Sequence, residues 1–406
     1  MNRIAIIGAG AAGIAAARRL EELRQDYVLL EAKPFVGGRC VTDHMTLGVP
    51  IDLGAHWFHS PGINPLVGYA DQLGIRYDRT ALAGRYSRNG AWLSDAEQAA
   101  CEAYVEECFA RIARFEGDVA ISELFPDTSS PWHDVFLAEQ CAKQGVESGA
   151  SSSRDFANYV WEGDDCPVTD GFGTLLAKLA EGLNIRVAAP VKRVDWSGRD
   201  IKLATPDGVL TAQRIILATP TAILHDGIDF SPALPGWKRR AIADLPMGSC
   251  NKVALRFSRP VFGDCPPSLI LPMRGAHEAV EFVIRESGAE IATCLINGPL
   301  GKELAAEGHQ AMANYALERL VEMFGNEVRH AASPQYVIAD WDHDPYIRGC
   351  YSAARVGRAD ARAELVMPVD DRLFFSGEAC SLNYMGDVHG AWFTGIAAAE
   401  AATILQ

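Results

Sequence analysis

The sequence has no run of about 20 apolar residues, the length that a membrane-spanning helix requires. Its ten cysteines are scattered, and they show neither CxxC pairs nor the spacing of a metal site. Scattered cysteines in a chain of 406 residues favour reduced thiols over a disulfide framework. We therefore expect a cytoplasmic protein without a bound metal.

Basic residues are also scarce, because 37 Lys and Arg stand against 52 Asp and Glu and give a net charge of −15. Such a chain repels nucleic acid and anionic membranes, and it mildly favours cationic ligands. A solvated acidic surface explains the charge equally well. We expect neither nucleic acid nor a membrane as a partner, and a homodimer is compatible with the sequence.

The N-terminus contains the pattern of a dinucleotide-binding turn. An apolar strand over residues 3–7 leads directly into Gly8-Ala9-Gly10-Ala11-Ala12-Gly13, and a small-residue helix follows to about residue 23. Gly8 permits the tight turn, Gly10 lets the backbone approach a pyrophosphate, and Gly13 lets the helix pack on the strand. The N–H groups at the start of the helix suit phosphate oxygens.

A second strand over residues 27–30 ends in Glu31, which lies 18 residues after Gly13. A carboxylate at this point can accept hydrogen bonds from both hydroxyls of an adenosine ribose. It would repel a charged 2′-phosphate, so NADP is disfavoured.

Further segments narrow the dinucleotide to a flavin. The glycines of Gly37-Gly38-Arg39 allow close backbone approach, and the guanidinium can neutralise a pyrophosphate. Near the C-terminus, Ser376-Gly377-Glu378 and Val388-His389-Gly390-Ala391 precede a final small-residue helix. The start of that helix suits negative charge on a reduced flavin ring.

Periodicity predicts the remaining elements. Strands are expected around residues 185–217, 252–257, 279–296 and 373–375, and helices over 96–115, 173–183, 309–324 and 390–404. Pro206-Asp207-Gly208 predicts a hairpin turn, because proline presets one turn residue and glycine tolerates the next. The apolar run that ends at Leu217, before Pro220, predicts a separate buried strand.

Length predicts two domains. The fold class we expect is α/β, with a Rossmann-type FAD-binding domain and an inserted mixed α+β substrate-binding domain. The FAD-binding domain would comprise residues 1–60, 170–230 and 350–406. The substrate domain would have a helical part, 61–169, and a part of sheet and helix, 231–349.

With these motifs in order, the chain resembles the flavin-dependent amine oxidases along nearly its whole length. The stretch from Gly54 to Pro65 is similar to the polyamine and spermine oxidase branch, and Asp170-Gly171-Phe172 and Asp344-Pro345 also fit the family. The resemblance implies FAD as the cofactor and implies that it contacts these residues: Gly8, Gly10, Ala11, Ala12, Gly13, Glu31, Gly38, Arg39, Gly54, Ala55, His56, Trp57, Val191, Trp341, Cys350, Gly377, Glu378 and Val388.

The resemblance also changes how single residues are interpreted. By its strand pattern alone Lys252 would face solvent, yet the family places a lysine here that holds a water against the reactive flavin nitrogen. His59 alone would be structural, whereas the family places a matching histidine beside the substrate. Trp57 and Trp341 alone would be core aromatics.

The family's pair of substrate-facing tyrosines is incomplete. Tyr351 fits the first position, but Asp387 stands at the second. Tyr384 matches a substrate-side tyrosine of the lysine-specific histone demethylase and its relatives. Asp387 would either attract a substrate ammonium or cap the last helix, and the sequence leaves both open.

Cys350, in Gly349-Cys350-Tyr351, matches the cysteine that carries covalent flavin in monoamine oxidases, where polyamine oxidases usually have serine. A covalent bond requires an ionised thiolate, and Arg348 is the adjacent positive charge. A buried apolar cysteine with non-covalent FAD is the alternative.

By resemblance, the function is oxidation of a small-molecule amine, either a polyamine or a monoamine, to an imine that is hydrolysed to an aldehyde. Molecular oxygen would reoxidise the flavin and give hydrogen peroxide. Relatives that oxidise an amino acid, a porphyrinogen or a carotenoid are one alternative. An amino acid would require an arginine for its carboxylate, for which Arg85, Arg256 and Arg285 are candidates. An NAD-dependent dehydrogenase and a non-catalytic FAD-binding protein are further alternatives.

Overall fold

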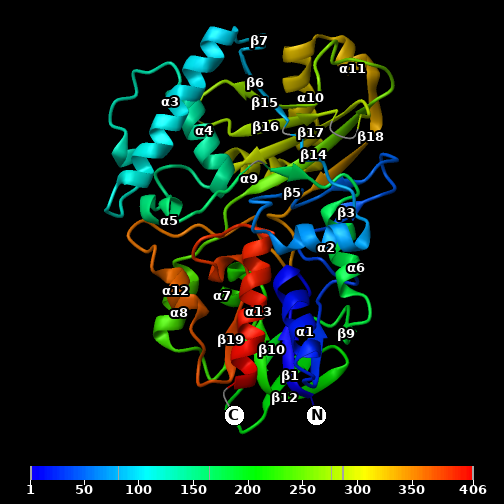
Figure 1. Cartoon of the computed structure of the whole chain (residues 1–406), viewed down its shortest axis with the longest axis vertical. Helices are drawn as coiled ribbons and strands as arrows, with labels where there is room; N and C mark the ends of the chain where they lie inside the picture. Colours follow the sequence, from blue (N-terminus) through cyan, green and yellow to red (C-terminus); the bar gives the residue numbers. More distant parts are fainter. Residues whose placement is uncertain (1, 81, 164, 276, 286–287, 405–406) are drawn as a thin grey trace.

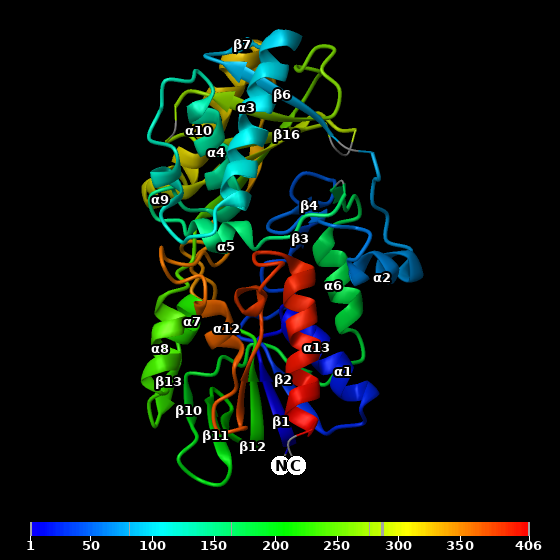
Figure 2. The same cartoon turned by 60° about the vertical axis from the view of Figure 1, so that its left-hand side comes forward.

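The computed structural model describes residues 2–80, 82–163, 165–275, 277–285 and 288–404. These residues form two halves, one above the other in Figure 1, and each half contains its own large sheet. The chain passes between the halves more than once, and both of its ends lie in the lower half (Figure 2).

The sheet of the lower half runs in the order β13-β10-β11-β12-β1-β2-β9. The strands β1, β2, β9 and the second half of β12 are parallel, whereas β11 pairs with the first half of β12 as an antiparallel hairpin. β19 joins β12 where β11 leaves it. The strands are β1 (Asn2–Ile7), β2 (Tyr27–Leu30), β9 (Ile185–Arg186), β10 (Arg193–Asp195), β11 (Ile201–Thr205), β12 (Gly208–Leu217), β13 (Asp229–Ser231) and β19 (Leu373–Phe375).

Two small-residue helices, α1 (Ala11–Glu22) and α13 (Val388–Ile404), cover one face of this sheet (Figure 1). Ile4 and Ile6 of β1 pack towards them, while Ala5 and Ile7 point to the other face. A side chain at Gly13 could not fit, because its Cβ would lie 1.8 Å from the carbonyl oxygen of Gly8. This is the packing role that the sequence predicts for Gly13.

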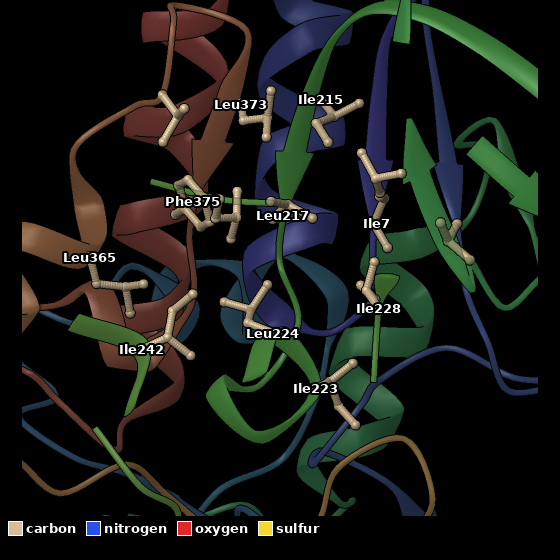
Figure 3. Packing of buried hydrophobic residues seen from close by; sticks show 14 of the residues in the cluster. Ile7, Ile215, Leu217, Ile223, Leu224, Ile228, Ile242, Leu365, Leu373 and Phe375 are labelled. Carbon is tan, nitrogen blue, oxygen red and sulfur yellow. The ribbon is translucent and has the colours of Figure 1, made fainter. Parts of the chain in front are cut away.

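Figure 3 shows the opposite face, where Ile7, Ile215 and Leu217 meet side chains from three short helices. These helices are α7 (Thr221–Asp226), α8 (Gly236–Ala243) and α12 (Ala361–Val366). The same cluster includes Leu245, so the core of the lower half extends beyond residue 230, where the sequence suggests a boundary. Because both faces of β1 and β12 are covered, their apolar runs are continuous.

The sheet of the upper half runs in the order β18-β14-β17-β16-β15-β6-β7. Its strands are β6 (Ala83–Arg88), β7 (Ala91–Trp92), β14 (Cys250–Phe257), β15 (Ser268–Met273), β16 (Val280–Ile284), β17 (Ile291–Asn297) and β18 (Ala332–Ala339). One apolar cluster joins this sheet to α9 (Gly298–Glu307), α10 (His309–Phe324) and α11 (Glu327–Ala331), and another joins it to α3 (Asp95–Arg114), η1 (Ile121–Leu124), α4 (His133–Gln144) and α5 (Ser153–Ala157).

Small elements complete the junction between the halves. Two short ribbons, β3 (Thr42–Asp43) with β4 (Ile51–Asp52) and β5 (Trp57–Phe58) with β8 (Cys166–Pro167), lie beside α2 (Pro65–Leu73) and α6 (Phe172–Ala180), and η2 (Glu378–Cys380) precedes α13.

The helices expected from periodicity are present as α3, α6, α10 and α13. α6 ends at Ala180 rather than at residue 183, because Glu181 is extended and Gly182 takes a positive φ of 81°. The two strands expected on either side of residue 213 are the single strand β12. Residues 286–287, within the expected strand region 279–296, lie outside the described residues.

The fold is α/β, with the Rossmann-type sheet that the sequence predicts. The strands of the lower sheet come from residues 2–30, 185–231 and 373–375, and those of the upper sheet from residues 83–92 and 250–339. Among the described residues, no helix has the length and apolar character to cross a membrane.

Candidate active site

A cavity of about 880 Å³ lies at the junction of the two halves. Its volume is within the range of roughly 300–1,000 Å³ that is usual for small-molecule and cofactor sites. The lower half supplies the turn after β1 and the loop before α13, and the upper half supplies β14, β15, β16 and α4. We call one part the glycine-turn end (Gly8, Gly10, Glu31, Arg39, Glu378) and the other the acidic end (His59, Glu139, Asp165, Glu281, Asp387).

At the glycine-turn end, Gly8 has a φ of 103°, and a Cβ there would lie 2.7 Å from the carbonyl oxygen of Ala218. Glu31 is buried, and its carboxylate accepts hydrogen bonds from the backbone N–H groups of Ala9 (2.7 Å) and Lys33 (2.9 Å). Burial raises the pKa of Glu31, although these N–H groups oppose the rise. The carboxylate is thus held in place at the cavity wall.

Glu378 is held from several sides. Its Oε1 accepts hydrogen bonds from Arg39 Nη1 and from the backbone N–H of Ser352, both at 3.1 Å. Its Oε2 accepts hydrogen bonds from Ser352 Oγ (2.7 Å) and from the backbone N–H of Gly386 (3.2 Å). Burial alone would raise the pKa of Glu378, but the guanidiniums of Arg39 and Arg362 lower it below its usual value. The site therefore keeps an ionised carboxylate beside Arg39.

Lys252 is buried and lines the cavity. Its Nζ donates to the carbonyl oxygens of Gly54 (2.5 Å) and Asp52 (3.3 Å), and it lies 5.7 Å from the centre of the Trp57 ring. The interpretation of Lys252 as a solvent-facing residue, based on its strand pattern alone, is wrong. Val253 and its alternate neighbours pack on the helices, while the opposite face of β14 meets the loop between β4 and β5.

Two further predicted residues stand beside this lysine. Trp341 is buried, and its Nε1 donates to the carbonyl oxygen of Leu53 (3.1 Å). His56 lies 2.9 Å, through Nδ1, from the carboxylate of Asp52. Both side chains belong to residues that line the cavity.

The acidic end is organised around His59. Its Nδ1 lies 2.7 Å from Asp165, and its Nε2 lies 4.0 Å from Asp387. Burial alone would lower the pKa of His59, but the carboxylates of Asp387 and Asp165 raise it. Tyr159 donates its hydroxyl proton to Asp387 at 2.6 Å.

The side chain of Asp387 therefore faces the cavity, while its backbone carbonyl accepts the first helical hydrogen bond, from Ala391 (3.1 Å). Burial raises the pKa of Asp387, and His59 and Tyr159 oppose that rise.

Two more carboxylates, on β16 and α4, complete this end. Burial raises the pKa of Glu281 to about 7; Lys143 opposes the rise and Glu139 adds to it. Burial also raises the pKa of Glu139, which accepts a hydrogen bond from the hydroxyl of Tyr86 (2.9 Å). The Nζ of Lys143 lies 4.3 Å from the centre of the Trp161 ring, in the same wall.

A family model described as flavin containing amine oxidoreductase matches residues 11–93 and 95–403. The chain belongs to this family. Polyamine oxidase 4 of Oryza sativa subsp. japonica is 30% identical over 98% of this chain and 88% of that protein. Lysine-specific histone demethylase 2 of Homo sapiens is 27% identical over 97% of this chain and 52% of that protein.

Solved structures show the same fold. Cyclohexylamine oxidase from Brevibacterium oxydans superposes with a TM-score of 0.83 at 21% identity, covering 99% of this chain and 98% of the other. Putrescine oxidase bound to putrescine gives 0.83 at 19% identity, covering 98% of each chain.

As a member of the flavin amine oxidoreductases, the protein is an FAD-dependent amine oxidase. The cavity fits that cofactor, because the glycine turn leaves space for phosphates and Glu31 stands where a ribose would bind. Of the predicted site residues, all line the cavity except Gly13, which packs under the turn, and Tyr384.

Tyr384 is not among the described residues that form the wall. Its ring packs against His389 (4.7 Å between ring centres) and Phe393 (6.0 Å) on α13. Burial lowers the pKa of His389 to about 4. Tyr384 thus packs against α13, and its substrate-side role stays a prediction.

Cys350 lines the cavity. Arg348 pairs with Asp226 on α7, and burial raises the pKa of Cys350 well above its usual value. The guanidinium that would favour a thiolate at Cys350 is thus engaged elsewhere, which supports the alternative of a buried apolar cysteine with non-covalent FAD.

The three arginines considered as carboxylate clamps are not among the described residues of the wall. Arg85 lies 4.2 Å over the ring of Trp92, Arg285 pairs with Glu290, and Arg256 donates to the carbonyl of Leu47. Among the described residues, no cluster of His, Cys, Asp and Glu has the arrangement of a metal site.

Three of the five residues of the acidic end were not predicted from the sequence, namely Glu139, Asp165 and Glu281, and neither were Lys143, Tyr159 and Trp161 beside them. The sequence does contain one signal for this end of the site. Glu281 stands between Val280 and Phe282 in an apolar strand, where a buried carboxylate is costly and therefore indicates a functional role.

Proposed function

We propose that this protein oxidises amines with two or more cationic centres to the corresponding imines, with oxygen as the electron acceptor and hydrogen peroxide as the product. The observation that carries the proposal is the acidic end, where Glu139, Asp165, Glu281 and Asp387 line one cavity. Lys143 is the lysine that acts on Glu281 there. Crowded carboxylates in a partly enclosed site favour a polycation over a neutral or anionic ligand.

His59 is suited to prepare the amine. An ammonium ion has no lone pair on nitrogen, so the reacting amine must lose a proton first. With Asp165 accepting a hydrogen bond from Nδ1 (2.7 Å), the neutral ring carries its lone pair on Nε2, which faces Asp387 and the cavity. Nε2 can accept the ammonium proton, and Asp165 and Asp387 stabilise the resulting imidazolium.

Tyr159 and Asp387 orient the substrate. The hydroxyl of Tyr159 holds one carboxylate oxygen of Asp387 at 2.6 Å, which leaves the other oxygen towards His59. An ammonium group can bind there before it transfers its proton.

The remaining groups serve the cofactor. FAD, when bound, accepts the two electrons of the oxidation. Glu31, Arg39 and Glu378 would hold its polar groups, and Lys252 fixes a positive charge at the wall through its bonds to Gly54 and Asp52. We infer that Lys252 orients a water molecule there.

The acidic end argues against the alternatives. An amino acid would bring a carboxylate among four others, and the arginines proposed as its partners are engaged elsewhere. A porphyrinogen or a carotenoid offers no array of cations to match these groups.

An amine panel tests the proposal. Holoprotein is mixed with a linear diamine, a triamine, an alkyl monoamine and an α-amino acid, and peroxide release and imine formation are measured. We expect kcat/KM to be highest for the diamine or triamine. If a flavin-loaded sample oxidises none of the amines, the proposed activity is wrong; higher kcat/KM for the amino acid shifts the function to that class.

A further inference from the structure

A chain of buried polar contacts leaves the cavity at Glu378 and ends on helix α5. The hydroxyl of Ser352 donates to Glu378 (2.7 Å) and accepts from Nη1 of Arg362 (2.8 Å). Arg362 then forms a bidentate ion pair with Asp155, through Nε (2.6 Å) and Nη2 (2.9 Å). The pair lies outside the cavity wall described above and does not take part in the proposed proton transfer.

This pair is sealed from solvent and fully hydrogen-bonded. Arg362 is 1% exposed and Asp155 0%. The other donors of Arg362 reach the carbonyl oxygens of Ser352 (2.9 Å) and Ala379 (3.3 Å), so all five of its N–H groups have acceptors. Asp155 also accepts from the backbone N–H of Ala354 (3.0 Å). Such a network has one favourable arrangement, and the loss of one member leaves a buried charge unsatisfied.

The far end of the chain belongs to a segment that lines the acidic end. Residues 152–161 include α5, and four of them, Phe156, Ala157, Tyr159 and Trp161, form part of the cavity wall. The segment is tied to the lower half at Asp155 and also by the hydrogen bond from Val160 N–H to the carbonyl of Asn383 (2.9 Å). The position of Tyr159, and through it of Asp387, therefore depends on this segment.

We propose that Arg362 is a positioning residue that couples FAD binding at Glu378 to the order of residues 152–161. FAD in contact with Glu378 fixes that carboxylate. Glu378 fixes Ser352, and Arg362 transmits the constraint to Asp155. By reciprocity, an ordered segment 152–161 strengthens FAD binding.

Hydrogen–deuterium exchange of the full chain, with and without FAD, tests this coupling. The variants are Asp155→Asn, which keeps the shape but removes the charge, and the milder Ser352→Ala, which leaves the ion pair and removes one hydroxyl. Arg319→Gln is the matched control. Arg319 is likewise buried and ion-paired, with Glu322 (2.8 Å), but it lies on α10.

In the unmodified chain we expect FAD to slow exchange in residues 152–161. Both variants should lose most of this protection and should bind FAD about tenfold more weakly, as expected for the loss of a hydrogen bond to a charged group. Arg319→Gln should retain the protection. FAD-dependent protection of residues 152–161 that is unchanged in Ser352→Ala overturns the proposal, whatever happens to FAD affinity. These measurements need no amine, so a failure of the proposed amine oxidation would be seen separately.

Discussion

The two ends of the cavity differ in how they are built and in how they hold charge. The glycine-turn end is largely backbone, and its carboxylates are matched: two N–H groups hold Glu31, and Arg39 holds Glu378. The acidic end is made of side chains from distant segments, and Asp387 and Glu281 have raised pKa values there. Burial raises the pKa of Glu31 as well, but its N–H donors oppose the rise, whereas the pKa of Glu281 reaches about 7, so Glu281 titrates near neutral pH.

This difference matches two tasks. A constant cofactor is best held by rigid groups that do not change with pH, whereas substrate selection benefits from groups whose charge responds to the ligand. Four carboxylates at the acidic end are unfavourable when the cavity contains no cation, and a bound polycation relieves their repulsion. Substitutions at either end of the cavity can test this difference.

The largest effect should come from Gly13→Ala, directly beneath the glycine-turn end. The new Cβ would lie 1.8 Å from the carbonyl oxygen of Gly8, so the turn or the helix must move. We expect a loss of about 1–3 kcal/mol or more in the free energy of unfolding, as for overpacking, together with loss of most bound FAD. Thermal unfolding and flavin absorbance measure both.

The matched control is Gly68→Ala in α2, where nothing lies within 4 Å of the added Cβ. It should leave flavin content unchanged and stabilise the protein slightly, because alanine is the better helix former. Equal effects of the two substitutions would contradict the view that the glycine turn is rigid by close packing.

The next effect concerns Lys252, which stands between the two ends. Lys252→Met should slow flavin reduction or reoxidation by about tenfold or more while FAD stays bound, because a charge fixed at the reacting face is lost. Stopped-flow absorbance measures both half-reactions. Lys202→Met, at an exposed strand position, is the control and should leave both unchanged. If flavin reduction and reoxidation are unchanged in Lys252→Met, the ammonium group of Lys252 has only a structural role.

The two ends also differ in how far their residues could be predicted from the sequence. The glycine-turn end lies in contiguous motifs whose geometry follows from local backbone rules, so Gly8, Gly10 and Glu31 could be located from spacing alone. Lys252 could be assigned to the site only through the family resemblance, because its strand pattern alone indicates a solvent-facing side chain. Only the tertiary fold shows that both faces of β14 are covered.

Apart from His59 and Asp387, the acidic end could not be predicted, because α4, β16 and the segment around Tyr159 meet only in the folded chain. Tyr384 illustrates the opposite case: its motif position suggested a substrate contact, but its ring turns towards α13. Sequence spacing places a backbone position, whereas packing decides which way its side chain points.

A moderate, pH-dependent effect is expected at the acidic end. Because the pKa of Glu281 is raised to about 7, its negative charge is present above that pH and is lost as the pH falls through 7. Attraction of a second ammonium group should follow the same course. The KM for a diamine, relative to an alkyl monoamine, should therefore fall as the pH rises from 6 to 8, by up to about tenfold, which corresponds to one pKa unit.

Glu281→Gln should flatten this pH dependence and keep the relative KM at its low-pH value. Lys143→Met should change the KM in the opposite direction. Removing this positive charge beside Glu281 should lower the KM for a triamine more than the KM for a monoamine. A relative KM that is independent of pH in the unmodified enzyme would exclude Glu281 from substrate selection.

The smallest effect is expected at Cys350, whose backbone carbonyl accepts a hydrogen bond from Arg39 of the glycine-turn end. Burial raises the pKa of this thiol, and Arg348 is paired with Asp226, so the reactive thiolate is disfavoured. We therefore expect FAD to be held by non-covalent contacts alone. Acid precipitation should leave the yellow colour in the supernatant, and Cys350→Ser should change flavin content and kcat/KM by less than about twofold, since the thiol acts as a small apolar group. A yellow pellet from the unmodified protein that becomes colourless in Cys350→Ser would show a thioether instead, and would mean that the glycine-turn end secures its cofactor by a bond rather than by matched charges.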